Sequence, residues 1–268
     1  MKRNSRFIIS MLVFGYAFLY VPLLSVIVYS FNDSRLATVW GGFSTRWYGE
    51  LLQNEQVTSA LFLSLKIGVT AATLATLFGT IAGIALARFG RFRGRNLFTG
   101  LVMSPMVMPE VITGLALLLL FVSLQQLTGW PGQRGFGTIT IAHTTFAIAY
   151  VAVIVQSRLS SMDESLEEAA MDLGGRPFRV MLDITLPLIA PAMLAGWLLA
   201  FTLSLDDLVL ASFVSGPGGS TLPMLIFSKV KLGVTPDINA LATLIMLFVT
   251  VGVVIAWSVG RHVQKSSD

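Results

Sequence analysis

The sequence contains no cysteine and few charged residues, which make up only 12% of its 268 positions. The lack of cysteine excludes disulfide bonds and thiolate metal sites. Charged residues usually make up about 25% of a soluble domain. Apolar residues make up 54% of this chain, and a soluble protein of that composition would expose large apolar patches. We therefore expect a protein whose solvent is the lipid bilayer.

Other absences narrow the class of function. The chain has no Gly-rich loop followed by Lys-Ser or Lys-Thr, so we do not expect it to hydrolyse ATP through that motif. The two histidines, His143 and His262, form no metal-ligand spacing, and we expect neither a metal site nor a bound cofactor. An intramembrane enzyme is disfavoured because no Ser/His pair, catalytic Asp pair or metal cluster is evident. A β-barrel is disfavoured because its apolar/polar alternation is missing.

Six apolar stretches are present, and about 20 such residues cross a bilayer as one helix. They run over residues 7–31, 60–87, 97–124, 138–155, 188–214 and 240–259. The prediction is an all-α integral membrane protein with six transmembrane helices in a single domain, residues 1–268.

The distribution of Lys and Arg predicts the orientation of these spans. If the N-terminus lies inside, the inner segments carry twelve basic residues, namely Lys2, Arg3, Arg6, Arg88, Arg91, Arg93, Arg95, Arg158, Arg176, Arg179, Arg261 and Lys265. The outer segments then carry five, namely Arg35, Arg46, Arg134, Lys229 and Lys231. Both termini are therefore expected in the cytoplasm. The net charge of +4 belongs to this bias and does not indicate nucleic acid.

The segment 158–187, between the fourth and fifth spans, is polar and acidic. Five carboxylates lie in its first part, within residues 163–173: Asp163, Glu164, Glu167, Glu168 and Asp172. An amphipathic connector lying on lipid is usually basic, because lipid surfaces are anionic. An acidic helix on the cytoplasmic side, where ATP is, is better suited to docking a protein.

The ends of this helix can be predicted from local signals. Ser161 and Glu164 have the spacing of a capping box, which predicts a helix over Asp163–Leu173. Gly174 can supply a left-handed turn at its end. A second helix is expected over Phe178–Leu186.

Three carboxylates lie inside predicted spans, where charge is costly and marks a functional site by default. Glu110, Asp206 and Asp207 all fall in the outer half of the bilayer by residue count and could share a vestibule that attracts an amine. Helix capping or an ion pair with a partner subunit explains the two aspartates equally well, and capping of a helix restarted after Pro109 explains Glu110. Trp47 and Tyr48 could stack on an alkyl amine, although an interfacial aromatic belt is the commoner explanation.

The acidic segment also matches a known motif. Glu168-Ala169-Ala170, Gly174 and Ile184-Thr185-Leu186-Pro187 fit the pattern E-A-A-x3-G-x9-I-x-L-P at every fixed position. This pattern resembles the cytoplasmic coupling loop of ABC importer permeases. Other stretches, among them Arg46-Trp47-Tyr48 and Met108-Pro109-Glu110, resemble the polyamine permeases of putrescine and spermidine import systems. The similarity is closest to the second permease subunit of the putrescine system.

The resemblance implies the type I importer (MetI-like) fold in a bacterial inner membrane. It implies a transport subunit rather than an enzyme, with a homologous second permease, two ATP-binding subunits that use ATP and Mg²⁺, and a periplasmic binding protein as partners. It implies contact with the ATPase through the loop. The residues assigned to that contact are Glu167, Glu168, Ala169, Ala170, Asp172, Gly174, Ile184, Leu186 and Pro187. Glu110, Asp206, Asp207, Trp47 and Tyr48 are assigned to the substrate pathway.

The expected function is ATP-driven import of a polyamine, foremost putrescine, by alternating access. Import of spermidine or another cationic solute by the same architecture is an alternative. A stand-alone secondary transporter is a further one, which would explain the buried carboxylates but not the acidic helix. The sequence leaves open the choice of amine, the permease–permease interface and which carboxylate meets the substrate.

Overall fold

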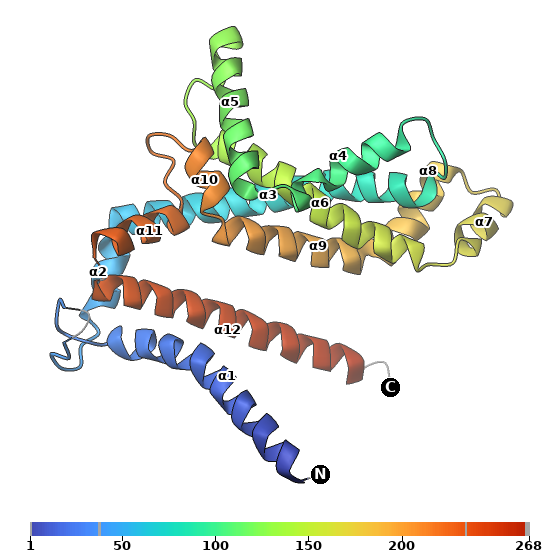
Figure 1. Cartoon of the computed structure of the whole chain (residues 1–268). Coiled ribbons are helices and arrows are strands. Elements are labelled where there is room, and N and C mark those ends of the chain that lie inside the picture. Colours follow the sequence, from blue (N-terminus) through green and yellow to red (C-terminus); the bar gives the residue numbers. More distant parts are fainter. Residues whose placement is uncertain (1, 37–38, 234, 266–268) are drawn as a thin grey trace. The chain divides into compact units, whose positions relative to one another are not determined.

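The computed structural model describes residues 2–36, 39–233 and 235–265 (Figure 1). These residues form helices joined by loops, with an isolated β-bridge between Asn32 and Phe43. The helices are α1 (Lys2–Tyr29), α2 (Arg46–Gln53), α3 (Glu55–Arg88), α4 (Arg95–Val107), α5 (Glu110–Thr128), α6 (Phe136–Ser160), α7 (Ser165–Asp172), α8 (Pro177–Val180), the π-helical turn η1 (Met181–Thr185), α9 (Leu186–Asp206), α10 (Val209–Val214), α11 (Leu222–Leu232) and α12 (Pro236–Lys265). The prediction of an all-α fold is confirmed over the described residues.

Among the described residues, five helical stretches are long and apolar enough to cross a membrane. They are Phe7–Tyr29, Glu55–Arg88, Glu110–Thr128, Phe136–Ser160 and Pro177–Asp206. A shorter apolar stretch, Pro236–Val251, covers the first part of α12. The side chains of Lys2, Arg3, Arg6, Arg261, His262 and Lys265, which enter the charge and metal predictions, lie outside the described residues.

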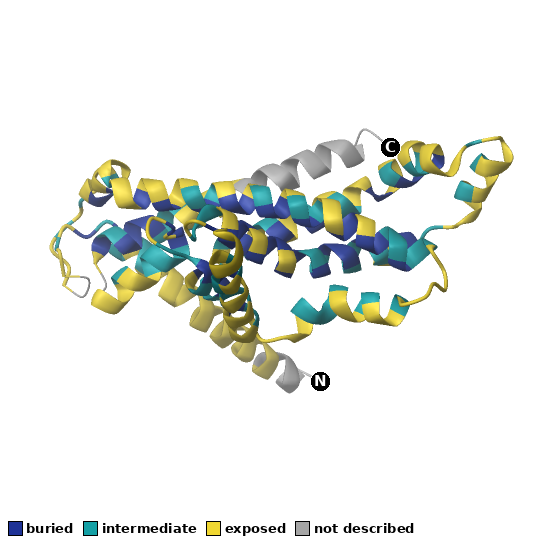
Figure 2. Cartoon of the chain, turned by 90° about the horizontal axis from the view of Figure 1, so that it is seen from above, coloured by how far each residue is buried: buried dark blue, intermediate teal, exposed yellow. Residues whose placement is uncertain are grey.

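The chain divides into two units. The smaller contains residues 1–58 and 226–268, and in it α12 packs against both α1 and α2. The larger contains residues 59–225, and α6 is its central helix, with α4, α9 and α10 packed around it. The side chains of α6 are buried on several faces, from Thr138 near its start to Leu159 near its end (Figure 2).

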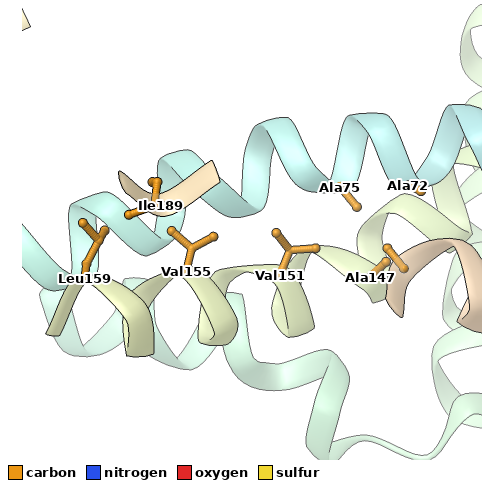
Figure 3. Close-up of a cluster of buried hydrophobic side chains, with 8 residues drawn as sticks. Ala72, Ala75, Ala147, Val151, Val155, Leu159 and Ile189 are labelled. Carbon is orange, nitrogen blue, oxygen red and sulfur yellow. The ribbon is translucent and has the colours of Figure 1, made fainter. Parts of the chain in front are cut away.

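The core of the larger unit depends on small residues of α3. Ala72 and Ala75 lie in one cluster with Val151 and Val155 of α6 (Figure 3). One turn further along α3, a Cβ at Gly79 would come within 2.7 Å of the Val151 Cβ. A Cβ at Gly83 would come within 2.9 Å of the Ala152 carbonyl oxygen. These positions follow the small-xxx-small spacing that lets helix backbones approach closely in membranes.

Two of the six predicted spans are not continuous helices. The stretch 97–124 contains α4 and α5, which are separated at Met108 and Pro109. Proline disfavours helical geometry in the residue before it, and Met108 is extended with ψ 135°. The stretch 188–214 contains α9 and α10, separated at Asp207, which is also extended with ψ 123°. Both breaks place a carboxylate beside an interrupted helix.

Candidate functional site

The acidic loop begins differently from the sequence prediction. Helix α7 starts at Ser165, two residues after the predicted start at Asp163, and the capping box is not formed. The Asp163 Oδ1 accepts the Ser165 backbone N–H at 3.0 Å, and this hydrogen bond lowers the pKa of the Asp163 carboxyl. The Glu164 carboxylate accepts an N–H of Arg88 at 2.9 Å instead of returning to Ser161. A long-range ion pair has therefore replaced the predicted local cap.

The end of α7 follows the prediction. Gly174 has φ +87°, in the left-handed region. The Gly174 N–H donates to the Met171 carbonyl at 2.9 Å, and the Gly175 N–H donates to the Ala170 carbonyl at 3.0 Å. This pair of bonds is a Schellman motif, and it satisfies carbonyls that the helix itself cannot. The fixed glycine of the motif thus has a backbone reason: a positive φ is needed here.

Substitution of Gly174 by alanine should loosen the last turn of α7. An L-residue in left-handed geometry costs about 1–2 kcal/mol, although the Cβ itself would meet no atom within 4 Å. We expect amide hydrogen exchange at residues 172–175 to accelerate roughly five-fold or more. Gly100→Ala, on α4 and also free of neighbours within 4 Å, is the matched control and should leave this exchange unchanged. Equal protection in wild type and Gly174→Ala would contradict the capping role.

The two faces of α7 have different surroundings. Within Ser165–Asp172, all of which the structure describes, no residue is buried. Leu166 is 51% exposed, and Leu173, just past the helix, is 91% exposed. Glu168, Ala169 and Asp172 are also exposed, whereas Glu167 faces the rest of the unit. The loop therefore presents apolar and acidic side chains together on an open surface, which is typical of a protein-docking site.

The second helix of the loop also differs from the expected Phe178–Leu186. Helix α8 starts at Pro177 and passes through η1 directly into α9. In η1, the Leu186 N–H donates to the Met181 carbonyl, five residues back. Pro187 has no N–H to donate to the Asp183 carbonyl, and its ring would crowd that carbonyl in a regular α-helix. The wider π-helical turn relieves this crowding. Leu186 packs against the core cluster, Ile184 is half-buried and Pro187 is exposed.

A second group of polar side chains lies at the α9–α10 break. The Asp207 carboxylate accepts the backbone N–H groups of Leu210 at 3.2 Å and Ala211 at 2.8 Å, so it caps α10. It also lies 2.9 Å from Nε2 of His143, whose side chain is only 2% exposed. The other ring nitrogen, Nδ1, is 2.6 Å from the Ser204 hydroxyl. Both ring nitrogens and both carboxylate oxygens are thereby satisfied.

Asp206 and Glu110 are placed differently from Asp207. Both are exposed, Asp206 at the end of α9 and Glu110 at the first residue of α5. The three carboxylates are close enough to interact electrostatically, and α5 packs against α10 (Figure 1). For Asp207, the helix-capping interpretation matches its contacts, and its other partner is His143 of the same chain. Asp206 and Glu110 leave an open pair of carboxylates that can attract a cation.

Comparison with known proteins identifies the family. Residues 75–267 match the family model for the inner membrane component of binding-protein-dependent transport systems. The chain belongs to this family. It is 59% identical to the putrescine transport system permease protein PotI of Escherichia coli K12, over 96% of this chain and 92% of that protein. It is 42% identical to the spermidine/putrescine transport system permease protein PotC of the same organism, over 94% of this chain and 93% of that protein.

Solved structures support the same fold. A bacterial alginate ABC transporter, in complex with an alginate-bound periplasmic protein, has a chain that superposes with a TM-score of 0.74 at 14% identity, covering 94% of this chain and 91% of that one. At this identity the likeness concerns the fold alone. The predicted ABC importer permease fold is confirmed at this level.

In this permease, the two aromatic residues assigned to the substrate pathway have local partners. Trp47 is 7% exposed, and its indole N–H donates to the Asn32 carbonyl at 2.7 Å. The Tyr48 hydroxyl lies 2.6 Å from the hydroxyl of Ser30. Both contacts lie within the smaller unit and hold the loop after α1 in shape. These contacts explain how the two side chains are held, and their assignment to the substrate pathway stays a prediction.

His143 and Ser204 are the permease residues that sequence reasoning missed. His143 was dismissed because it has no metal-ligand spacing, and its partners Ser204 and Asp207 are 61 and 64 residues away. The available signal was a lone histidine inside an apolar span, which marks a site by default because its polar atoms need partners there. The identity of those partners required the tertiary structure.

Proposed function

We propose that this chain is one permease subunit of an ATP-driven importer that moves a polyamine, most specifically putrescine, from the periplasm to the cytoplasm. The 59% identity to a putrescine transport system permease over nearly the whole chain is the observation that carries this proposal. The lower identity to a spermidine/putrescine permease favours putrescine over spermidine.

The proposed topology has six transmembrane helices with both termini in the cytoplasm. The excess of Lys and Arg in the segments assigned to the inside supports this orientation. It puts the acidic loop on the cytoplasmic side and the loop around Trp47 on the periplasmic side. The apolar start of α12 supports the sixth span.

The proposed partners are a homologous second permease, two copies of an ATP-binding subunit and a periplasmic binding protein. The open surface of α7, with Glu168, Ala169, Asp172 and Leu173, is the part offered to the ATP-binding subunit. Small side chains such as Ala169 allow a partner to approach the helix backbone. When ATP closes the two ATP-binding subunits on each other, they would move α7. That movement would rock the spans between outward-facing and inward-facing states.

The proposed amine pathway uses Glu110 and Asp206. Putrescine carries an ammonium group at each end, and two exposed carboxylates within electrostatic range of each other suit such a dication. Asp207 would act indirectly, because its oxygens are held by His143 and by the start of α10. Its part is to fix the helix break that carries Asp206.

The test is to express the chain with its neighbouring transport subunits, purify the assembly and measure ATP hydrolysis in proteoliposomes with a panel of amines. We expect an ATP-binding subunit to co-purify, and putrescine to stimulate hydrolysis and uptake more than spermidine or basic amino acids do. Uptake by the chain alone, driven by an ion gradient, would instead support a secondary transporter. Stimulation by spermidine but not putrescine would overturn the proposed specificity.

A further inference from the structure

One arginine connects the coupling loop to the membrane helices. Arg88 is the last residue of α3, and its side chain is 12% exposed. One Nη atom donates to Glu164 at 2.9 Å, and Nε lies 3.1 Å from Oε2 of Glu167, an ion-pair distance. The other oxygen of Glu167, Oε1, accepts the hydroxyl of Thr185 at 2.9 Å. We call these four residues the Arg88 link.

The Arg88 link joins three elements that are distant in sequence. Arg88 belongs to α3, Glu167 belongs to α7, and Thr185 is the last residue of η1, immediately before α9. Figure 1 shows the end of α3 and helices α7 and α8 at the same end of the larger unit. Thr185 is 4% exposed, and the neighbouring Leu186 packs on the core cluster. The link thus runs from the loop into the packed core.

Helix α7 contacts α8 and η1 but has no buried face. Each of its residues, Ser165–Asp172, is described and none is buried, so the link is a prominent part of what holds it. At one end it is followed by Gly174 and Gly175, and glycines allow the backbone to change direction easily. Without the link, a displacement of α7 by a partner would be taken up by a change in this turn and would not reach the core. The ion pair and hydrogen bond of the link resist that displacement.

Glu167 and its neighbour Glu168 are therefore not equivalent. The side chain of Glu167 is 17% exposed and its two oxygens are engaged by Arg88 and Thr185. The side chain of Glu168 is exposed. Consecutive helical residues point about 100° apart, so one can face the bundle while the other faces a partner.

We propose that the Arg88 link is the mechanical connection through which movement of α7 reaches α3 and α9. Arg88, Glu167 and Thr185 are positioning residues for transport, and Glu168 belongs to the docking surface. The inference rests on the proposed function, because it requires an ATP-driven partner on α7. The inference goes beyond the proposed function, because it assigns the transmission of force to residues that do not touch that partner.

The experiment compares amine imported per ATP hydrolysed in the complete reconstituted transporter. For Arg88→Gln and Glu167→Gln, we expect this ratio to fall about ten-fold, which lies within the range of typical allosteric couplings. The amount of co-purified ATP-binding subunit should stay unchanged. Thr185→Val should lower the ratio too, and Thr185→Ser, which keeps the hydroxyl, should restore it. Asp183→Asn, at an exposed carboxylate of η1 two residues from Thr185 and outside the docking surface, is the matched control and should keep the wild-type ratio.

The outcomes separate the link from a merely structural role. If Arg88→Gln and Thr185→Val leave the amount of amine imported per ATP unchanged, the proposed link is wrong. This includes the case in which uptake and ATP hydrolysis fall in parallel. If Glu168→Gln weakens co-purification while Glu167→Gln does not, the division between docking and transmission is supported. If no ATP-binding subunit accompanies even the wild-type chain, the proposed function itself fails, and that result is recognisable before any variant is tested.

Discussion

Replacing Gly79 by valine should strongly destabilise the packing of α3 against α6. The new Cβ would lie 2.7 Å from the Val151 Cβ, closer than real Cβ contacts come, and 3.0 Å from the Ile148 carbonyl oxygen, which is also a tight approach. Val151 is fully buried, so it has no space to move into. Overpacking of a core usually costs about 1–3 kcal/mol, and a branched side chain against a helix backbone should reach or exceed the upper end.

The measurement is the thermal midpoint of the purified transporter in detergent, monitored as the loss of monodisperse complex on heating. We expect Gly79→Val to lower the midpoint by several degrees or to prevent purification of the complex. Gly100→Val is the control, because it makes the same change in a helix where a Cβ meets no atom within 4 Å. Equal behaviour of the two variants would show that the close approach of α3 and α6 does not occur.

The second large effect concerns the two adjacent aspartates. Asp207→Ala removes the cap of α10, worth about 0.5–2 kcal/mol, and leaves the buried His143 without its acceptor, worth about 1–3 kcal/mol. We therefore expect a strongly destabilised transporter. Asp206→Ala removes an exposed carboxylate that has no such contacts in the structure described, so the complex should remain stable while putrescine uptake falls roughly ten-fold.

Thermal stability and uptake are measured on both variants at equal amounts of assembled complex. Asp206→Asn and Asp207→Asn serve as near-isosteric controls, since each keeps the shape and loses the charge. The account predicts opposite patterns: stability is lost at residue 207 and transport at residue 206. It is contradicted if Asp206→Ala destabilises the complex as much as Asp207→Ala, or transports normally.

Two local signals in the sequence, a glycine and a proline, predicted local structure correctly. Gly174, just past an amphipathic stretch and before Pro177, favoured a left-handed turn at a helix end, and the structure has that turn. Pro109 predicted a restarted helix, and α5 begins at the next residue, Glu110. In each case the cause is the backbone preference of one residue, so neighbouring sequence is sufficient.

Features that depend on distant partners could not be predicted in this way. Glu164 was expected to cap its own helix, but Arg88, 76 residues earlier, offers a charged donor that a local cap cannot match. The inward direction of Glu167 depends on Arg88 and Thr185 for the same reason. The role of Asp207 depends on His143, which the fold brings to the helix break. Periodicity indicates which residues share a face but not what that face meets.

Site-specific crosslinking from α7 tests the central claim most directly. The native chain has no cysteine, so Ala169→Cys provides a single attachment point for a maleimide–benzophenone label. Leu232→Cys, at a residue 88% exposed at the end of α11, is the control on the side assigned to the periplasm. In active transporter, we predict that light joins the label at residue 169 to the ATP-binding subunit and that the label at residue 232 never reaches it. Crosslinks from residue 169 to lipid alone, in a preparation that still imports putrescine, would contradict the account.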